Sequence, residues 1–112
     1  KVVVRSPKRG ANARLVETRL ERAVLREASL TDAILDGAIL DRADLRDADL
    51  RGANLTNSKL RSCNLQQARL EGADLRGAEI ADCDLRATYD HSTQWPDAFD
   101  PVQSGAVHTV SG

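Results

Sequence analysis

Two cysteines, Cys63 and Cys83, have the side-chain chemistry that is easiest to anticipate from residue type and spacing. Two thiols can form a disulfide or bind a metal ion. Two thiolates without a neighbouring histidine or further cysteine do not complete a zinc site, so we expect no metal centre. Two interpretations remain open: reduced residues that pack in the interior, which we favour, and a redox-linked disulfide.

The histidines, His91 and His108, both lie in the C-terminal part of the chain. Asp90, His91 and Ser92 supply the residue types of a catalytic triad, but they are consecutive and no strand-turn context surrounds them. The sequence contains no Gly-rich phosphate loop and no dinucleotide fingerprint. We therefore predict no catalytic residue and no cofactor, and we expect that the chain is not an enzyme.

The composition is unusual for a globular domain with an ordinary core. The 112 residues include one Trp, one Tyr, one Phe and no Met, and 16 basic side chains nearly balance 17 acidic ones. A chain without a strong field of one sign is not expected to recruit nucleic acid or an anionic membrane. No apolar run approaches the roughly 18 residues of a membrane span, so we expect a soluble protein.

A leucine recurs every five residues from Leu15 to Leu85, with Ile80 filling the single remaining slot. The residue two places before each of these is small, and both cysteines occupy that slot. We number each five-residue unit so that the small residue is position 1 and the leucine is position 3. A continuous helix would spread these leucines all round its surface, and a strand alternates with period two. The repeat therefore predicts short extended segments joined by turns.

Four such units close a square coil of 20 residues, with positions 1 and 3 both directed inward. Successive coils then stack through parallel β-ladder hydrogen bonds, about 4.8 Å apart. Gly37, Gly52, Gly72 and Gly77 all stand at position 5, where glycine relieves a tight corner.

The pattern Ala-Asp/Asn-Leu at residues 43–45, 48–50, 53–55 and 73–75 resembles the pentapeptide-repeat family. The resemblance covers residues 11 to about 89. It implies an all-β fold, a right-handed quadrilateral parallel β-helix (solenoid) of about four 20-residue coils with terminal caps. The handedness comes from the resemblance alone.

Both ends change composition where a solenoid needs caps over its open ladder edges. The expected division is an N-terminal cap or linker at residues 1–10, a solenoid at 11–89 and an aromatic C-terminal cap or tail at 90–112. Tyr89, Trp95 and Phe99 fall within eleven residues, and we expect them to cover the last leucine layer. A partly exposed Trp95 and Phe99 would instead form a partner-binding hot spot. The tail is similar to one that closes cyanobacterial members, which implies a photosynthetic or bacterial source.

In a 20-residue coil, every fourth unit shares a face. Cys63 and Cys83 should then lie directly above one another, behind Ala23 and Ala43. Their Cα atoms would be within disulfide range, although parallel Cβ vectors suit a disulfide poorly.

Arg26, Arg46 and Arg86 form a basic stripe on one face, beside an acidic stripe that includes Asp44 and Asp84. We expect a self-neutralising, solvated surface, because exposed ion pairs contribute little to stability. The alternative is a docking stripe for an acidic partner.

Val24, Ile34 and Ile39, together with Val16, are apolar at outward positions of the first two coils. Either the N-terminal segment covers them or they mark a contact patch for another protein.

These features favour a non-catalytic protein-interaction or scaffold module that presents a rigid surface to another protein. The resemblance implies a second possibility, a DNA mimic that binds DNA gyrase. Residues 11–88 hold 14 acidic and 12 basic side chains, however, far from one charge per about 1.7 Å of duplex. A third possibility is a structural spacer in a larger chain. The family's range implies the cytoplasm, with the thylakoid lumen or periplasm as alternatives.

Overall fold

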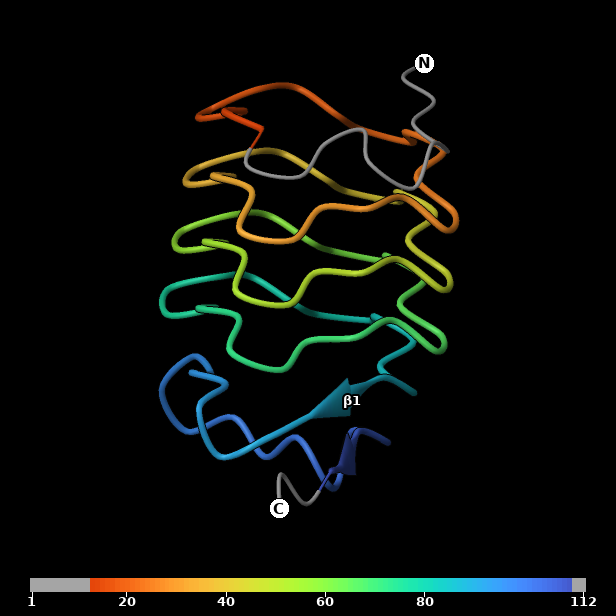
Figure 1. The fold of residues 1–112 in the computed structure, drawn as a ribbon, viewed down its shortest axis with the longest axis vertical. Helices are drawn as coiled ribbons and strands as arrows, with labels where there is room; N and C mark the ends of the chain where they lie inside the picture. The colour runs from red at the N-terminus through yellow and green to blue at the C-terminus, as the bar shows by residue number, and fades with distance from the viewer. Residues whose placement is uncertain (1–12, 110–112) are drawn as a thin grey trace.

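The computed structural model describes residues 13–109, which form a stack of coils from the N-terminal to the C-terminal end (Figure 1). The expected cap or linker at residues 1–10 lies outside the described residues. Parallel bridges join residues one coil apart and define four faces. The first face holds Arg14, Ile34, Asn54, Asp74 and Gln94; the second holds Arg19, Ile39, Lys59 and Glu79; the third holds Val24, Asp44, Asn64 and Asp84; the fourth holds Ser29, Asp49, Arg69 and Thr88.

Most of these ladders are single bridges, because each straight segment is too short for a longer strand. Two strands occur in residues 13–109, β1 (Thr88–Tyr89) and β2 (Val107–His108), and they pair in parallel. The same residues contain no helix.

The backbone of each unit forms hydrogen bonds in two directions along the stack. The N–H of position 3 donates to the carbonyl of position 2 in the next coil. The N–H of position 5 donates to the carbonyl of position 4 in the next coil. The N–H of position 2 donates to the carbonyl of position 1 in the previous coil. The N–H of position 1 donates to the carbonyl of position 3 in the preceding unit, which closes the turn between the two units. In the unit at residues 48–52 these bonds measure 2.9, 3.0, 2.9 and 3.1 Å. The ladder therefore leaves only the N–H of position 4 without a backbone partner.

The corner at position 5 is left-handed in every unit from residues 13–17 to residues 78–82. The four glycines predicted to relieve it have φ between +71° and +75°. Ten further units hold a side chain there, with φ between +54° and +62°: Glu17, Arg22, Glu27, Asp32, Arg42, Asp47, Asn57, Ser62, Gln67 and Asp82. The turn geometry, with a left-handed third residue as in a type II turn, thus recurs whether or not the residue is glycine.

The interior consists of columns of leucine and columns of small residues. From Leu20 to Leu75 each position-3 side chain is at most 3% exposed, and the alanines between them at position 1 are almost all fully buried. Ser58 occupies position 1 once, and its hydroxyl donates to the carbonyl of Leu55 at 2.7 Å, which satisfies the buried polar group.

The five-residue spacing ends at Leu85, yet the coil continues for a further layer. Tyr89 and Trp95 take over position 3 above the last leucines of their columns. The N–H of Leu70 donates to the carbonyl of Thr88, which precedes Tyr89, at 2.8 Å. The N–H of Leu75 donates to the carbonyl of Gln94, which precedes Trp95, at 2.7 Å. One unit has therefore shortened to four residues, and the next has lengthened to six.

The aromatic residues pack against one another at this end. Tyr89 is 7% exposed and meets Trp95 edge-on, with ring centroids 5.4 Å apart. Phe99 stacks on Trp95 at 5.3 Å, and His108 of β2 meets Tyr89 edge-on at 5.0 Å. These rings lie over the last leucine-filled layer of the solenoid.

Candidate interaction surface

The Asp or Asn at position 2 completes the hydrogen bonding of its unit. Wherever position 2 is Asp or Asn, its side-chain oxygen accepts the otherwise unpaired N–H of position 4, at 3.0 to 3.3 Å. The acceptors are Asp44, Asp49, Asn54, Asn64, Asp74 and Asp84. The Asp/Asn preference in the repeat thus has a structural cause, since both an amide and a carboxylate have an oxygen that accepts this bond.

Where an arginine follows at position 4, its guanidinium forms two hydrogen bonds to the same carboxylate. In the predicted basic stripe, Arg46 binds Asp44 at 2.9 and 2.7 Å, and Arg86 binds Asp84 at 2.9 and 2.5 Å. Arg26 has no such partner, because position 2 of its unit is Val24. The side-chain hydrogen bond from arginine holds the pKa of Asp44 and of Asp84 below its usual value. Two of the three stripe arginines are therefore held by the chain's own carboxylates.

The predicted apolar residues lie half-buried on three different faces. Ile34 and Ile39 flank the same corner, at Gly37, whereas Val24 lies on the third face. Val16 is 45% exposed. The structure thus brings Ile34 and Ile39 to one edge of the solenoid and leaves Val24 apart from them.

Trp95 and Phe99 are half-buried against the core. The indole Nε1 of Trp95 is buried and has no hydrogen-bond partner among the described residues. Their exposed parts remain a predicted contact surface.

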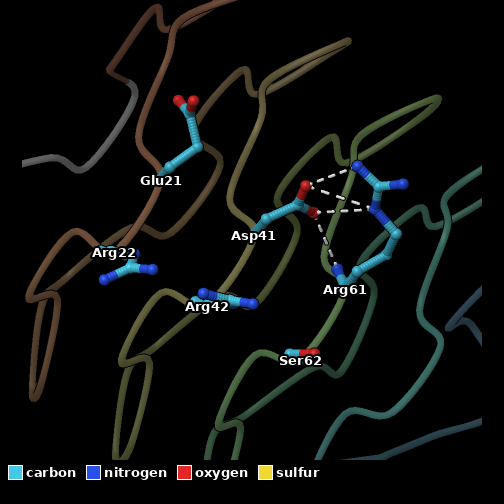
Figure 2. Close-up of a pocket in the computed structure, with 6 residues that line it drawn as sticks. All are labelled: Glu21, Arg22, Asp41, Arg42, Arg61 and Ser62. Carbon is cyan, nitrogen blue, oxygen red and sulfur yellow. Dashed lines mark hydrogen bonds and ion pairs between the residues drawn. The ribbon is translucent and has the colours of Figure 1, made fainter.

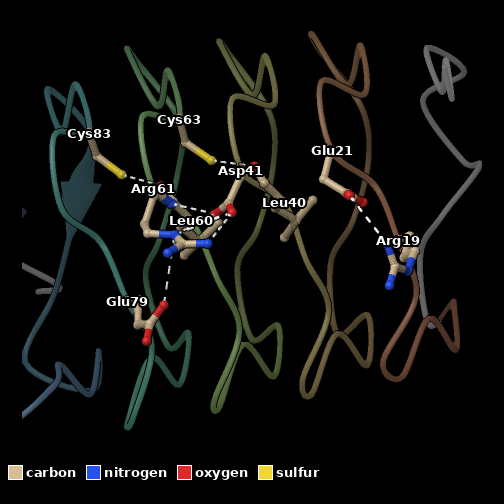
Figure 3. A network of polar contacts seen from close by, with 9 residues as sticks. All are labelled: Arg19, Glu21, Leu40, Asp41, Leu60, Arg61, Cys63, Glu79 and Cys83. Carbon is tan, nitrogen blue, oxygen red and sulfur yellow. Dashed lines mark hydrogen bonds and ion pairs between the residues drawn. The ribbon is translucent and has the colours of Figure 1, made fainter.

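Cys63 and Cys83 lie in adjacent coils with both thiols free (Figure 3). Each S–H donates to a carbonyl of the coil beneath, Cys63 to Leu40 at 2.7 Å and Cys83 to Leu60 at 2.6 Å. The interaction with the Cys83 thiol, together with burial, raises the pKa of Cys63 far above its usual range, whereas the same interaction lowers the pKa of Cys83. Both S–H groups are used in hydrogen bonds to backbone carbonyls, and the choice between reduced packing residues and a redox-linked disulfide stays a prediction.

A shallow pocket lies at the corner between the second and third faces (Figure 2). Its volume is about 430 Å³, and its lining residues are Glu21, Arg22, Asp41, Arg42, Arg61 and Ser62. The predictions from sequence omitted this site. The sequence contains a pattern that could have indicated it, because Arg22, Arg42 and Ser62 all stand at position 5 and are spaced by one coil.

One wall of the pocket is an ion-pair network across coils. Arg61 donates its backbone N–H to Asp41 at 3.0 Å, and its Nη2 contacts the same carboxylate at 2.7 Å. Its Nε also lies 3.8 Å from Glu79 on the next coil (Figure 3). The side-chain hydrogen bond from Arg61 lowers the pKa of Asp41, so this carboxylate is ionised at neutral pH.

Neither a metal centre nor a membrane span is found in the part of the chain that the structure describes. Residues 13–109 contain no cluster of three or more His, Cys, Asp or Glu side chains that could hold a metal ion. They also contain no helix that is long and apolar enough to cross a membrane.

The repeat matches a known family over most of its length. The family described as pentapeptide repeats matches in eight copies, at residues 11–42, 38–77 and 53–88. The chain belongs to the pentapeptide-repeat family. A comparison with curated protein sequences finds no match.

Several solved structures of pentapeptide-repeat proteins resemble this one. Rfr23 from the cyanobacterium Cyanothece 51142 is 36% identical, with a TM-score of 0.74, over 75% of this chain and 58% of its own. HetL, involved in heterocyst differentiation regulation in the cyanobacterium Nostoc sp. strain PCC 7120, is 26% identical (TM-score 0.51, 87% of this chain, 56% of its own). AT2G44920 from the Arabidopsis thaliana thylakoid lumen is 24% identical (TM-score 0.54, 87% of this chain, 59% of its own). This chain therefore spans less than two thirds of each relative.

These relatives confirm the predicted fold class. The pentapeptide-repeat solenoid is a right-handed β-solenoid, as the resemblance had implied. The predicted likeness to cyanobacterial members is confirmed as well, since two of these three relatives are cyanobacterial.

Proposed function

We propose that this pentapeptide-repeat chain is a non-catalytic protein-interaction module, a rigid solenoid whose outer faces contact another protein. The observation that carries this proposal is the filled interior. Leucine columns that are at most 3% exposed from Leu20 to Leu75 leave no space there for a substrate. Recognition therefore falls to the outer side chains.

The outer side chains are held in fixed positions, which favours binding. Four arginines form forked pairs with the carboxylate two residues before them, and each pair is anchored to a backbone ladder: Arg46, Arg51, Arg76 and Arg86. Side chains that are already ordered lose less conformational entropy when a partner binds. The same pairs disfavour a DNA-mimicking surface, because each neutralises a carboxylate that such a surface would have to expose.

The proposal is tested by affinity capture from a lysate of the cells that carry the gene, with mass spectrometry of the retained proteins. The wild-type chain is compared with an Ile34→Ser/Ile39→Ser variant, which removes the apolar edge around Gly37. A matched control, Val102→Ser/Val107→Ser, removes two valines that are 64% and 59% exposed at the other end of the solenoid.

We expect one or more proteins to be captured by the wild type and the control and lost by the Ile34→Ser/Ile39→Ser variant, with melting temperatures unchanged. A protein lost only by the control would move the contact to the C-terminal end. If no protein is retained specifically by any of the three, the proposed function is wrong.

A further inference from the structure

We infer that the pocket between the second and third faces binds carboxylate groups of an acidic segment of a partner protein. Arg22 and Arg42 are the binding side chains, and the Ser62 hydroxyl is a third donor. This inference rests on the proposed function, because it specifies the chemistry of the partner.

The three side chains form one column along the solenoid. They stand at position 5 of three successive coils, so neighbouring residues are about 4.8 Å apart along the axis. Figure 2 shows them in a row at the edge of the pocket. The ladder fixes their backbones, since the N–H of Arg22 donates to the carbonyl of Asp41 at 2.9 Å and that of Arg42 to the carbonyl of Arg61 at 2.8 Å.

Arg22 and Arg42 lack the carboxylate that an arginine at position 4 acquires. Position 2 of their own units is Arg19 and Ile39, so neither unit supplies an aspartate. Within residues 13–109, no ion pair involves Arg22 or Arg42. Two arginines on successive coils therefore have no ion-pair partner among residues 13–109.

The acidic side chains of the pocket are already engaged elsewhere. Asp41 is bound by Arg61, with a closest contact of 2.7 Å, and the Glu21 carboxylate lies 3.8 Å from Arg19 (Figure 3). A carboxylate from outside would neutralise the two like charges and take up their free N–H donors. The arginines elsewhere on this surface bind carboxylates through paired N–H groups, which shows the contact that a partner carboxylate can make.

The charges around the pocket favour discrete acidic side chains over a long polyanion. The position-5 column continues from Ser62 to Asp82, whose carboxylate would repel the next phosphate of a nucleic acid. A nucleic-acid backbone needs a continuous basic track, which this corner does not provide.

The test measures the binding of fluorescein-labelled hexaglutamate to the whole chain by fluorescence anisotropy at low salt, with hexaglutamine as the neutral probe. We expect hexaglutamate to bind, hexaglutamine not to bind, and added salt to weaken binding because the contacts are exposed. The double variant Arg22→Gln/Arg42→Gln should weaken binding by about tenfold or more, the equivalent of losing one charge-assisted contact.

The matched control is Arg14→Gln/Arg69→Gln. It removes the same charge from two exposed arginines on the first and fourth faces that form no ion pair within residues 13–109. We expect it to change affinity by less than about twofold, as screened, distant charges should. An equal loss in the control would show diffuse charge attraction and overturn the inference, as would equal binding of both peptides.

A hexathymidylate that binds through Arg22 and Arg42 more tightly than hexaglutamate would overturn the choice of a protein partner.

Failure of the peptide-binding test can be distinguished from failure of the proposed function. If the peptide experiment fails while affinity capture still retains a partner, the interaction module stands and only its acidic docking site is wrong.

Discussion

At the scale of single residues, the side chain at position 2 links the sequence pattern to the backbone. The ladder uses four of the five N–H groups of a unit, and the Asp or Asn oxygen accepts the fifth. When Arg follows, the same carboxylate also binds its guanidinium. The first contact needs only an oxygen acceptor, whereas the second needs a charge, so the two can be separated by mutation.

Substitution of Asp49 separates these contacts. Asp49→Asn keeps the acceptor for the Arg51 N–H and loses the ion pair, which should cost about 1 kcal/mol because the pair is only partly exposed. Asp49→Ala also leaves that N–H without its partner and should cost about 1–2 kcal/mol. Urea unfolding of both variants measures the difference. Equal losses would show that the N–H bond contributes nothing.

The paired aspartates should make the fold acid-sensitive. Side-chain hydrogen bonds from arginine lower the pKa of Asp44, Asp49, Asp74 and Asp84 in the folded state. The unfolded chain then binds more protons than the folded chain near pH 4, so stability rises with pH there. The contribution is complete above the unfolded pKa of about 3.9 and is lost as pH falls through the lower folded values.

Urea unfolding at pH 6 and pH 3 tests this expectation, and the midpoint should be lower at pH 3. In a variant with these four aspartates changed to Asn, the difference between the two pH values should shrink. A variant that loses as much stability in acid as the wild type would contradict the assignment of this effect to the four ion pairs.

At the scale of the element, the corner turn imposes a left-handed residue in every unit from residues 13–17 to residues 78–82. A side chain costs roughly 1–2 kcal/mol in that conformation, yet ten units accept it. The turn is therefore maintained by the ladders on either side and not by glycine. Glycine has a second use where the neighbouring coil approaches closely.

A pair of glycine substitutions distinguishes the two roles. At Gly72 an added Cβ would find its nearest atoms at 3.6 Å, so Gly72→Ala should cost only the left-handed penalty, about 1 kcal/mol. At Gly52 the Cβ would meet an oxygen of the exposed Asp32 carboxylate, which must rotate away, so Gly52→Ala should cost slightly more. The difference should disappear in Asp32→Ala/Gly52→Ala, as measured by chemical denaturation. A persistent difference would place the collision elsewhere.

At the scale of the whole molecule, stability comes from identical layers that each contact only their neighbours. A charge in one layer affects both adjoining layers, because the leucine columns run through the stack. Leu50 is 1% exposed, with leucines above and below it in its column.

Leu50→Asp should unfold the solenoid cooperatively, because burying an unpaired carboxylate costs more than the 5–15 kcal/mol that stabilises a typical domain. Circular dichroism should show the β signal lost at room temperature. Val102→Asp, which places the same charge at a 64% exposed site, should change stability by less than about 0.5 kcal/mol. A folded Leu50→Asp variant would contradict the continuous core.

The fold could be predicted from the sequence because its rules act within five residues. The spacing of leucine and of small residues determines which side chains point inward, and a 20-residue coil follows from four such units. The adjacent-coil placement of Cys63 and Cys83 follows from that arithmetic alone. The paired Asp and Arg of the third face could be anticipated as stripes in the same way.

Other features were decided by the tertiary structure, because they depend on how coils meet. The units of four and six residues that bring Tyr89 and Trp95 into the leucine columns follow from the ladder register, which no five-residue rule contains. Likewise, Arg61 binds Asp41 of the neighbouring coil at 2.7 Å, a pair that no rule within one unit contains. The sequence determined where each backbone unit lies. Only the packing of one coil on the next decided the ion pairs that cross coils and the aromatic contacts at the C-terminal end.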